Sequence, residues 1–109
     1  MSATFNGYSK SELIAIFKAM ATSRRMDEKM LTLLRQGKSF FHIGAAGHEG
    51  AQLACAMNMK PGFDWAYPYY RDMAFMLGLG VKLEDIFLHQ LAKAHRSSHL
   101  FPYCFLEKQ

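Results

Sequence analysis

The chain has 109 residues, of which 50% are hydrophobic and 20% charged, and its formal net charge is +4. This length allows one domain at most, and the hydrophobic content excludes an intrinsically disordered chain. No apolar run reaches the ~18 residues of a membrane span, so we expect no membrane-spanning helix. The N-terminus lacks the basic and apolar regions of a signal peptide. The two cysteines, Cys55 and Cys104, define no disulfide framework and favour a reducing compartment.

The first predicted helix follows Ser9 and ends near Gly37. Ser9 and Glu12 form the pattern of a capping box, and Gly37 suits the residue that ends a helix. Arg24 and Asp27 stand three residues apart on this helix, and we expect them to form an ion pair. Apolar residues recur at spacings of three and four, which predicts a buried stripe. That stripe consists of Leu13, Ile16, Phe17, Met20, Leu31 and Leu34.

Residues 38–47 are too few and too rich in glycine for a helix, and residues 40–43 are expected to form a brief extended segment. The glycines match neither of the common phosphate-binding patterns. His42 and His48 lie six residues apart, and no third ligand stands at a recognised spacing. The sequence therefore predicts no metal ligand here.

Three shorter helices are expected in the rest of the chain. The second begins at His48 and ends before Pro61, the third covers residues 71–77, and the fourth covers residues 83–94. The methionines of this region are expected to fill the core. Residues 95–109 show neither a helical nor an alternating pattern, so we assign no structure to them.

The connection at residues 61–72 holds the only tryptophan and two of the three prolines, which makes it a shaped loop. Tyr70 and Arg71 stand at its end, where the third helix is expected to begin. A phenol, a guanidinium fork and a helix N-terminus together suit a multiply charged oxyanion. The alternative is structural: the aromatic rings anchor the core, and Arg71 pairs with Asp72 or Asp64.

Four segments, residues 23–30, 35–38, 40–49 and 61–72, resemble one family in their order and spacing. This family is the α chain of the thiamine-diphosphate-dependent 2-oxo acid dehydrogenases, the decarboxylating first component of those complexes. The Asp-Trp and Pro-Tyr-Tyr-Arg-Asp form of the last segment is most similar to the branched-chain, or 2-oxoisovalerate, type. The resemblance covers about residues 8–94.

The resemblance implies that Tyr70 and Arg71 bind the diphosphate of thiamine diphosphate and that Phe41 lies near the side chain of the substrate. It implies a mainly α chain, in which residues 1–94 are the helical N-terminal segment of an α/β thiamine-diphosphate-binding fold. Residues 95–109 are a tail unlike the family. The fold's parallel sheet is expected to lie beyond this segment.

The family's Gly-Asp-Gly magnesium motif does not occur here, and its activating glutamate belongs to the β chain or to a fused β part. The resemblance thus implies no catalytic residue and no metal ligand in this chain, and we expect the isolated chain to be inactive. Expected partners are the β chain, a lipoyl-bearing acyltransferase and further copies in an oligomer, in a bacterial cytoplasm or a mitochondrial matrix.

Two other classes of function compete with this interpretation. A non-catalytic helical module that assembles with a partner chain would keep the same core. A small basic nucleic-acid binder would need a basic stripe and a reading element. Because the basic residues scatter around the first helix, we expect no nucleic-acid partner.

Overall fold

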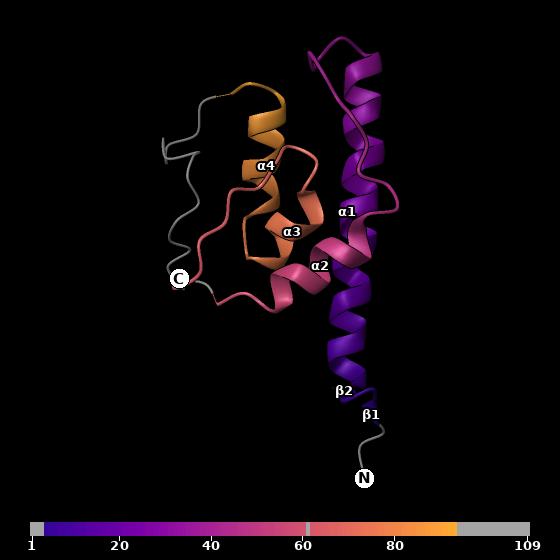
Figure 1. The fold of residues 1–109 in the computed structure, drawn as a ribbon. Helices are drawn as coiled ribbons and strands as arrows, with labels where there is room; N and C mark the ends of the chain where they lie inside the picture. Colours follow the sequence, from indigo (N-terminus) through magenta and orange to yellow (C-terminus); the bar gives the residue numbers. More distant parts are fainter. Residues whose placement is uncertain (1–3, 61, 94–109) are drawn as a thin grey trace.

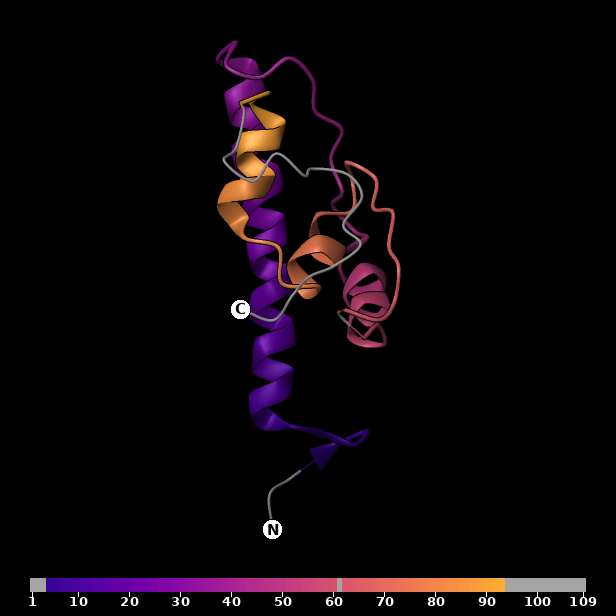
Figure 2. The ribbon, with the colours of Figure 1, turned by 90° about the vertical axis from the view of Figure 1, so that its left-hand side faces the viewer.

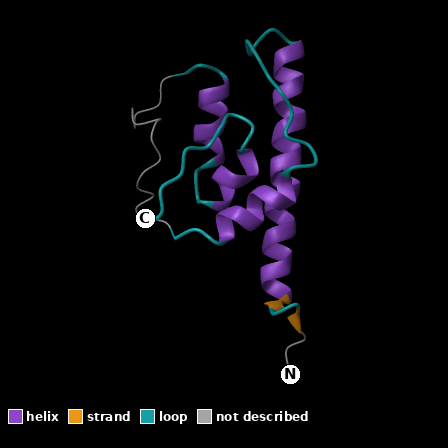
Figure 3. Cartoon of the chain, viewed as in Figure 1, coloured by secondary structure: helices purple, strands orange, loops and turns teal. Residues whose placement is uncertain are grey.

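The computed structural model describes residues 4–60 and 62–93. In these ranges the chain forms a short hairpin and then four helices, and the longest helix, α1 (Lys10–Arg35), runs along one side of the molecule (Figure 1). The other helices pack beside it, joined by long loops (Figure 3). The mainly helical fold expected from the sequence is confirmed. None of the described helices is long and apolar enough to cross a membrane.

A short hairpin, which the sequence pattern did not predict, precedes α1. Strands β1 (Thr4–Phe5) and β2 (Tyr8–Ser9) pair antiparallel. Asn6 and Gly7 connect them with φ angles of 49° and 85°. Two successive left-handed residues are the mark of a tight hairpin turn, for which Asn-Gly is the preferred pair.

The predicted start and end of α1 are confirmed. Ser9 Oγ accepts a hydrogen bond from the Glu12 N–H, and Glu12 Oε2 accepts one from the Ser9 N–H at 2.7 Å, which completes the capping box. After Arg35 the chain turns at Gly37, whose φ of 70° is left-handed and whose N–H donates to the Leu34 carbonyl.

The predicted buried stripe of α1 is wrong in its position. The buried residues are Ser23, Met26 and Met30, whereas Phe17 is 70% exposed and Leu31 is 39% exposed. The reason is that α1 is longer than the layer that covers it. Figure 2 shows its N-terminal turns extending past the other helices, and the apolar residues Leu13, Ile16 and Met20 are only half-buried.

Helix α2 (Glu49–Met57) begins where expected, with His48 as its N-cap residue. Helix α3 (Met73–Gly78) begins two residues later than predicted, because Tyr70 and Arg71 belong to a turn. Helix α4 (Leu83–Gln90) is shorter than predicted, and Ala92 follows it with a left-handed φ of 52°. The predicted end at Ala94 and the tail at residues 95–109 lie outside the described residues, and residues 40–43 lie in a loop.

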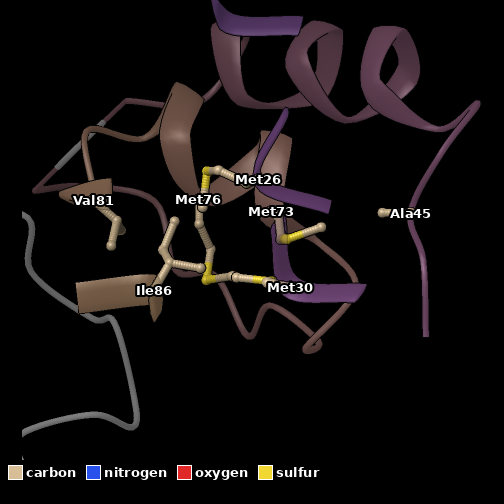
Figure 4. Packing of buried hydrophobic residues seen from close by; sticks show 7 residues of the cluster. All are labelled: Met26, Met30, Ala45, Met73, Met76, Val81 and Ile86. Atoms are coloured by element: carbon tan, nitrogen blue, oxygen red, sulfur yellow. The ribbon is translucent and has the colours of Figure 1, made fainter. Parts of the chain in front are cut away.

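The core lies between the middle of α1 and the two C-terminal helices. Four methionines form its centre, two from α1 and two from α3, and Ile86 of α4 packs in the same cluster (Figure 4). Full burial of such a side chain contributes roughly 1.5–3 kcal/mol. The members are Met26, Met30, Ala45, Met73, Met76, Val81 and Ile86. The expectation that methionine fills the core is therefore confirmed for Met73 and Met76.

Candidate functional site

Tyr70 and Arg71 occupy the centre of a closed turn that precedes α3. The Asp72 N–H donates to the Tyr69 carbonyl at 2.9 Å, and Asp72 Oδ2 accepts from the Tyr69 N–H at 2.7 Å. Two hydrogen bonds between the same pair of residues fix the backbone on both sides of Tyr70 and Arg71. The turn, rather than the helix, positions these two side chains.

Three aromatic rings meet at Tyr70. Phe41 approaches it edge to face, with ring centroids 5.4 Å apart and an interplanar angle of 71°, and Tyr69 lies at 4.0 Å. This edge-to-face geometry is a favourable aromatic arrangement. Hydrogen bonding with the Tyr69 side chain raises the pKa of the Tyr70 phenol, so Tyr70 stays a neutral hydrogen-bond donor near pH 7. The structure thus brings Phe41 and Tyr70 together from segments 29 positions apart in the sequence.

The structural alternative for Arg71 is not what the molecule shows. Asp72 accepts from the backbone of Tyr69 and from Gln52, and Asp64 accepts from the Lys60 N–H at 2.6 Å. Within residues 4–60 and 62–93, no carboxylate pairs with the half-buried Arg71 guanidinium. A guanidinium with five donors and no protein anion beside it suits an external oxyanion.

The expected contribution of a helix N-terminus is wrong. Helix α3 has only six residues. The Ala74 N–H in its first turn donates to Gln52 Oε1 at 3.1 Å, and the Met76 N–H donates to the Asp72 carbonyl. These two amides are therefore engaged within the protein, and the candidate oxyanion donors are the side chains of Tyr70 and Arg71.

The loop that carries Phe41 is held at both ends. On one side, Gln90 Nε2 of α4 donates to the Phe41 carbonyl and to Ser39 Oγ. On the other side, Asp27 Oδ1 lies 2.9 Å from His42 Nε2 and accepts from the Ala45 N–H at 3.0 Å. The His42 side chain is 5% exposed, so this histidine is a structural partner of Asp27.

The predicted Arg24–Asp27 ion pair is wrong, because each residue has a partner elsewhere. Arg24 Nε donates to Glu49 Oε1 at 2.6 Å, and Glu49 Oε2 accepts from the Gly47 N–H at 2.8 Å. The Arg24 hydrogen bond lowers the pKa of Glu49 to about 2. Asp27 instead holds the loop described above. The two acidic groups join α1 to the segment that leads into α2.

The donor set fits a diphosphate only in part. Arg71 and Tyr70 supply one cation and one phenol, and the cavity beneath Tyr70 holds about 20 Å³, room for about one water molecule. In the part of the chain that the structure describes, no group of three or more His, Cys, Asp or Glu side chains is placed to hold a metal ion. These residues therefore form one open wall of a site, with Phe41, 54% exposed, beside it.

Sequence reasoning missed the residues that support this wall, namely Gln52, Gln90, Asp27 and His42. One signal was present for Gln52, which lies next to the buried face of α2 marked by Glu49, Leu53 and Ala56. A polar residue beside such a face needs a hydrogen-bond partner. No local signal identified the partners of the other three.

Comparison with known proteins identifies the family. Residues 17–101 match the family model described as "Dehydrogenase E1 component". The chain is 35% identical over 88 residues to the 2-oxoisovalerate dehydrogenase subunit alpha of Bacillus subtilis, covering 81% of this chain and 27% of that protein. It is 36% identical over 80 residues to the pyruvate dehydrogenase E1 component subunit alpha of Acholeplasma laidlawii, covering 73% of this chain and 23% of that protein.

The pyruvate dehydrogenase E1 component subunit alpha of Staphylococcus epidermidis is 31% identical over 91 residues, covering 84% of this chain and 24% of that protein. The chain thus spans about a quarter of the length of these relatives. No solved structure matches it. Because the family model covers well over half of the residues, the chain belongs to the dehydrogenase E1 component family.

Proposed function

We propose that this chain supplies part of the diphosphate-binding wall of a thiamine-diphosphate-dependent 2-oxo acid dehydrogenase, as an α-type component. The observation that carries the proposal is the half-buried guanidinium of Arg71, which has no carboxylate partner in the described residues and follows Tyr70 in a closed turn. Family membership supplies the reaction class. In this proposal residues 1–94 are the helical segment, and residues 95–109 are a separate tail.

Each residue has a distinct task in this proposal. Arg71 offers a planar fork of donors to phosphate oxygens, and the neutral Tyr70 phenol would donate one further hydrogen bond once its O–H turns from Tyr69 to the phosphate. Phe41, in edge contact with Tyr70, presents an apolar ring where an aliphatic acyl chain would lie. When bound, thiamine diphosphate supplies the carbanion chemistry that decarboxylates a 2-oxo acid. Magnesium would be held by other residues, and the activating glutamate would come from a β chain.

We propose a narrower substrate class than family membership alone implies. We favour a branched-chain 2-oxo acid, as for the Bacillus subtilis relative named for 2-oxoisovalerate. Relatives named for pyruvate match at similar identity, so the choice between these substrates depends on the selectivity test with Phe41→Ala below. The compared relatives are bacterial, which favours a bacterial cytoplasm over a mitochondrial matrix.

The decisive experiment is a calorimetric titration of thiamine diphosphate with magnesium into the wild-type chain and variants. Arg71→Lys keeps the charge but loses the fork, so we expect affinity to fall by about one to two decades, the equivalent of ~1.5–3 kcal/mol for a charged hydrogen bond. Arg25→Lys is the matched control. Arg25 pairs with Glu28 at 3.0 Å on the exposed face of α1, so its variant should bind like the wild type.

A second variant separates the cofactor from the substrate. Phe41→Ala should leave the affinity for thiamine diphosphate unchanged and alter selectivity among 2-oxo acids once the chain is assembled with a β chain. If Arg71→Lys binds like the wild type while Phe41→Ala loses the cofactor, the assigned roles are wrong. Absence of binding by the wild-type chain would contradict the cofactor assignment itself.

One observation favours the alternative of a helical assembly module. Large apolar side chains are exposed on several elements, with exposed fractions of 70% for Phe17, 78% for Phe63 and 59% for Trp65. Exposed apolar surface of this kind marks association with other chains. Either role predicts binding to a β chain and self-association, and only the first predicts binding of thiamine diphosphate. In the full assembly, a lipoyl-bearing acyltransferase would be the third partner.

A further inference from the structure

The side-chain amide of Gln52 makes three hydrogen bonds to residues 71–74, two to backbone atoms and one to the Asp72 carboxylate. Its Nε2 donates to the Arg71 carbonyl at 3.1 Å and to Asp72 Oδ1 at 3.4 Å. Its Oε1 accepts from the Ala74 N–H at 3.1 Å. One half-buried amide thus spans the end of the turn and the first turn of α3, and all of its contacts lie at Arg71 or within three residues after it.

These contacts complete a network that leaves the Arg71 backbone few alternatives. Asp72 already joins the Gln52 amide to the Tyr69 N–H, because its two carboxylate oxygens accept one from each. Arg71 lies one residue before the N-cap of α3, and Gln52 Nε2 donates to its carbonyl. Gln52 is therefore the side chain that fixes the peptide carbonyl of Arg71.

Helix α2 is a firm base for this contact. It crosses α1 near the middle of that helix (Figure 1). Leu53 and Ala56 are each 3% exposed, and Glu49 at its start pairs with Arg24 of α1 at 2.6 Å. A side chain on a helix anchored in this way holds its position, so the direction of Gln52 is set by the packing of α2.

We propose that Gln52 is a positioning residue for oxyanion binding: it fixes the Arg71 backbone from α2 and so aims the guanidinium at its ligand. The inference rests on the proposed function of Arg71, and it assigns to α2 a task in the site that the family resemblance does not. Gln52 itself does not touch the ligand. Its loss should weaken binding by loosening Arg71, while the fold remains intact.

The test uses the whole 109-residue chain and two variants. Gln52→Met keeps the length of the side chain and removes all three hydrogen bonds. Asn58→Leu is the matched control, because Asn58 lies at the other end of α2 and, within the described residues, its side-chain amide donates only to the Ala54 carbonyl at 2.8 Å. Inorganic pyrophosphate and thiamine diphosphate serve as probes in calorimetry, and amide hydrogen exchange reports on Ala74.

We expect Gln52→Met to weaken the binding of both probes by about tenfold and to speed exchange of the Ala74 amide by about five- to tenfold, as for loss of one hydrogen bond. Asn58→Leu should change neither quantity by more than about twofold. Similar thermal unfolding of the two variants would show that the difference arises locally.

The exchange measurement separates failure of this inference from failure of the proposed function. Unchanged Ala74 exchange in Gln52→Met overturns the positioning role, whatever the ligand. Faster exchange with unchanged pyrophosphate affinity also overturns it. If the wild-type chain binds neither probe, the proposed function of Arg71 fails and the positioning role for an oxyanion fails with it, while the exchange rates still decide whether Gln52 holds the turn.

Discussion

Replacement of Gly78 by alanine tests how closely α2 and α3 pack. A Cβ atom at this position would lie 2.6 Å from Ala56 Cβ and 3.1 Å from Leu53 Cδ2, whereas ordinary contact begins near 3.4 Å. The methyl group of Ala56 has no alternative rotamer, and Ala56 and Leu53 are each 3% exposed. The two helices must therefore separate by close to 1 Å, and overpacking of this kind costs roughly 1–3 kcal/mol.

Alanine also favours a helix over glycine by up to ~1 kcal/mol, which opposes the steric cost. We expect Gly78→Ala to lower the free energy of unfolding by about 1–2 kcal/mol, or roughly 4–8 °C in Tm for each kcal/mol. Gly50→Ala in α2 is the control, because its Cβ would meet only Met20 Cε at 3.8 Å. That variant should gain ~0.5–1 kcal/mol.

Both changes in stability are measured by urea and thermal unfolding, followed by circular dichroism at a wavelength that reports helix content. The pair is informative because the propensity gain is similar and only the steric term differs. If Gly78→Ala is as stable as Gly50→Ala, the close approach of α2 and α3 is refuted. The positioning of the Arg71 turn by α2 would then lose its structural basis.

Two further predictions concern the Arg24–Glu49 ion pair and the N-cap residue of α1. The hydrogen bond from Arg24 holds the pKa of Glu49 at about 2, below its usual 4.5. Its contribution to stability is thus complete above pH 4.5 and is lost as the pH falls toward 2. Urea midpoints across this range should show the loss, and Glu49→Gln should remove most of that pH dependence; an unchanged profile would contradict the pair. Ser9→Ala removes the N-cap of α1 and should cost ~1 kcal/mol in chemical unfolding, against no change if the helix frays there in the wild type.

Local patterns predicted the elements well where the physics is local. The Ser9 and Glu12 capping box and the left-handed Gly37 act on backbone groups within four residues, so they marked both ends of α1 correctly. The hairpin before α1 is equally local, since its Asn-Gly turn involves only neighbouring residues. Helix α3 began later than its apolar pattern suggested, because Asp72 closes a turn back to Tyr69.

The sequence indicated which residues belong to the candidate site, but it did not indicate how they are arranged in space. The resemblance selected Phe41, Tyr70 and Arg71, and the contact of Phe41 with Tyr70 is consistent with a shared site. Their roles toward a cofactor and a substrate stay predictions. The supports of the site, Gln52 among them, came only from the structure.

The sequence alone therefore determined the helical class, the limits of α1 and the family. Only the tertiary structure decided which face of α1 is buried, and that Arg24 pairs with Glu49 across 25 positions while Asp27 pairs with His42 across 15. The physical reason is how far apart along the chain the interacting groups lie. Caps and turns are satisfied within a few residues, whereas an ion pair or a buried amide takes whichever partner the path of the loops brings within hydrogen-bonding distance.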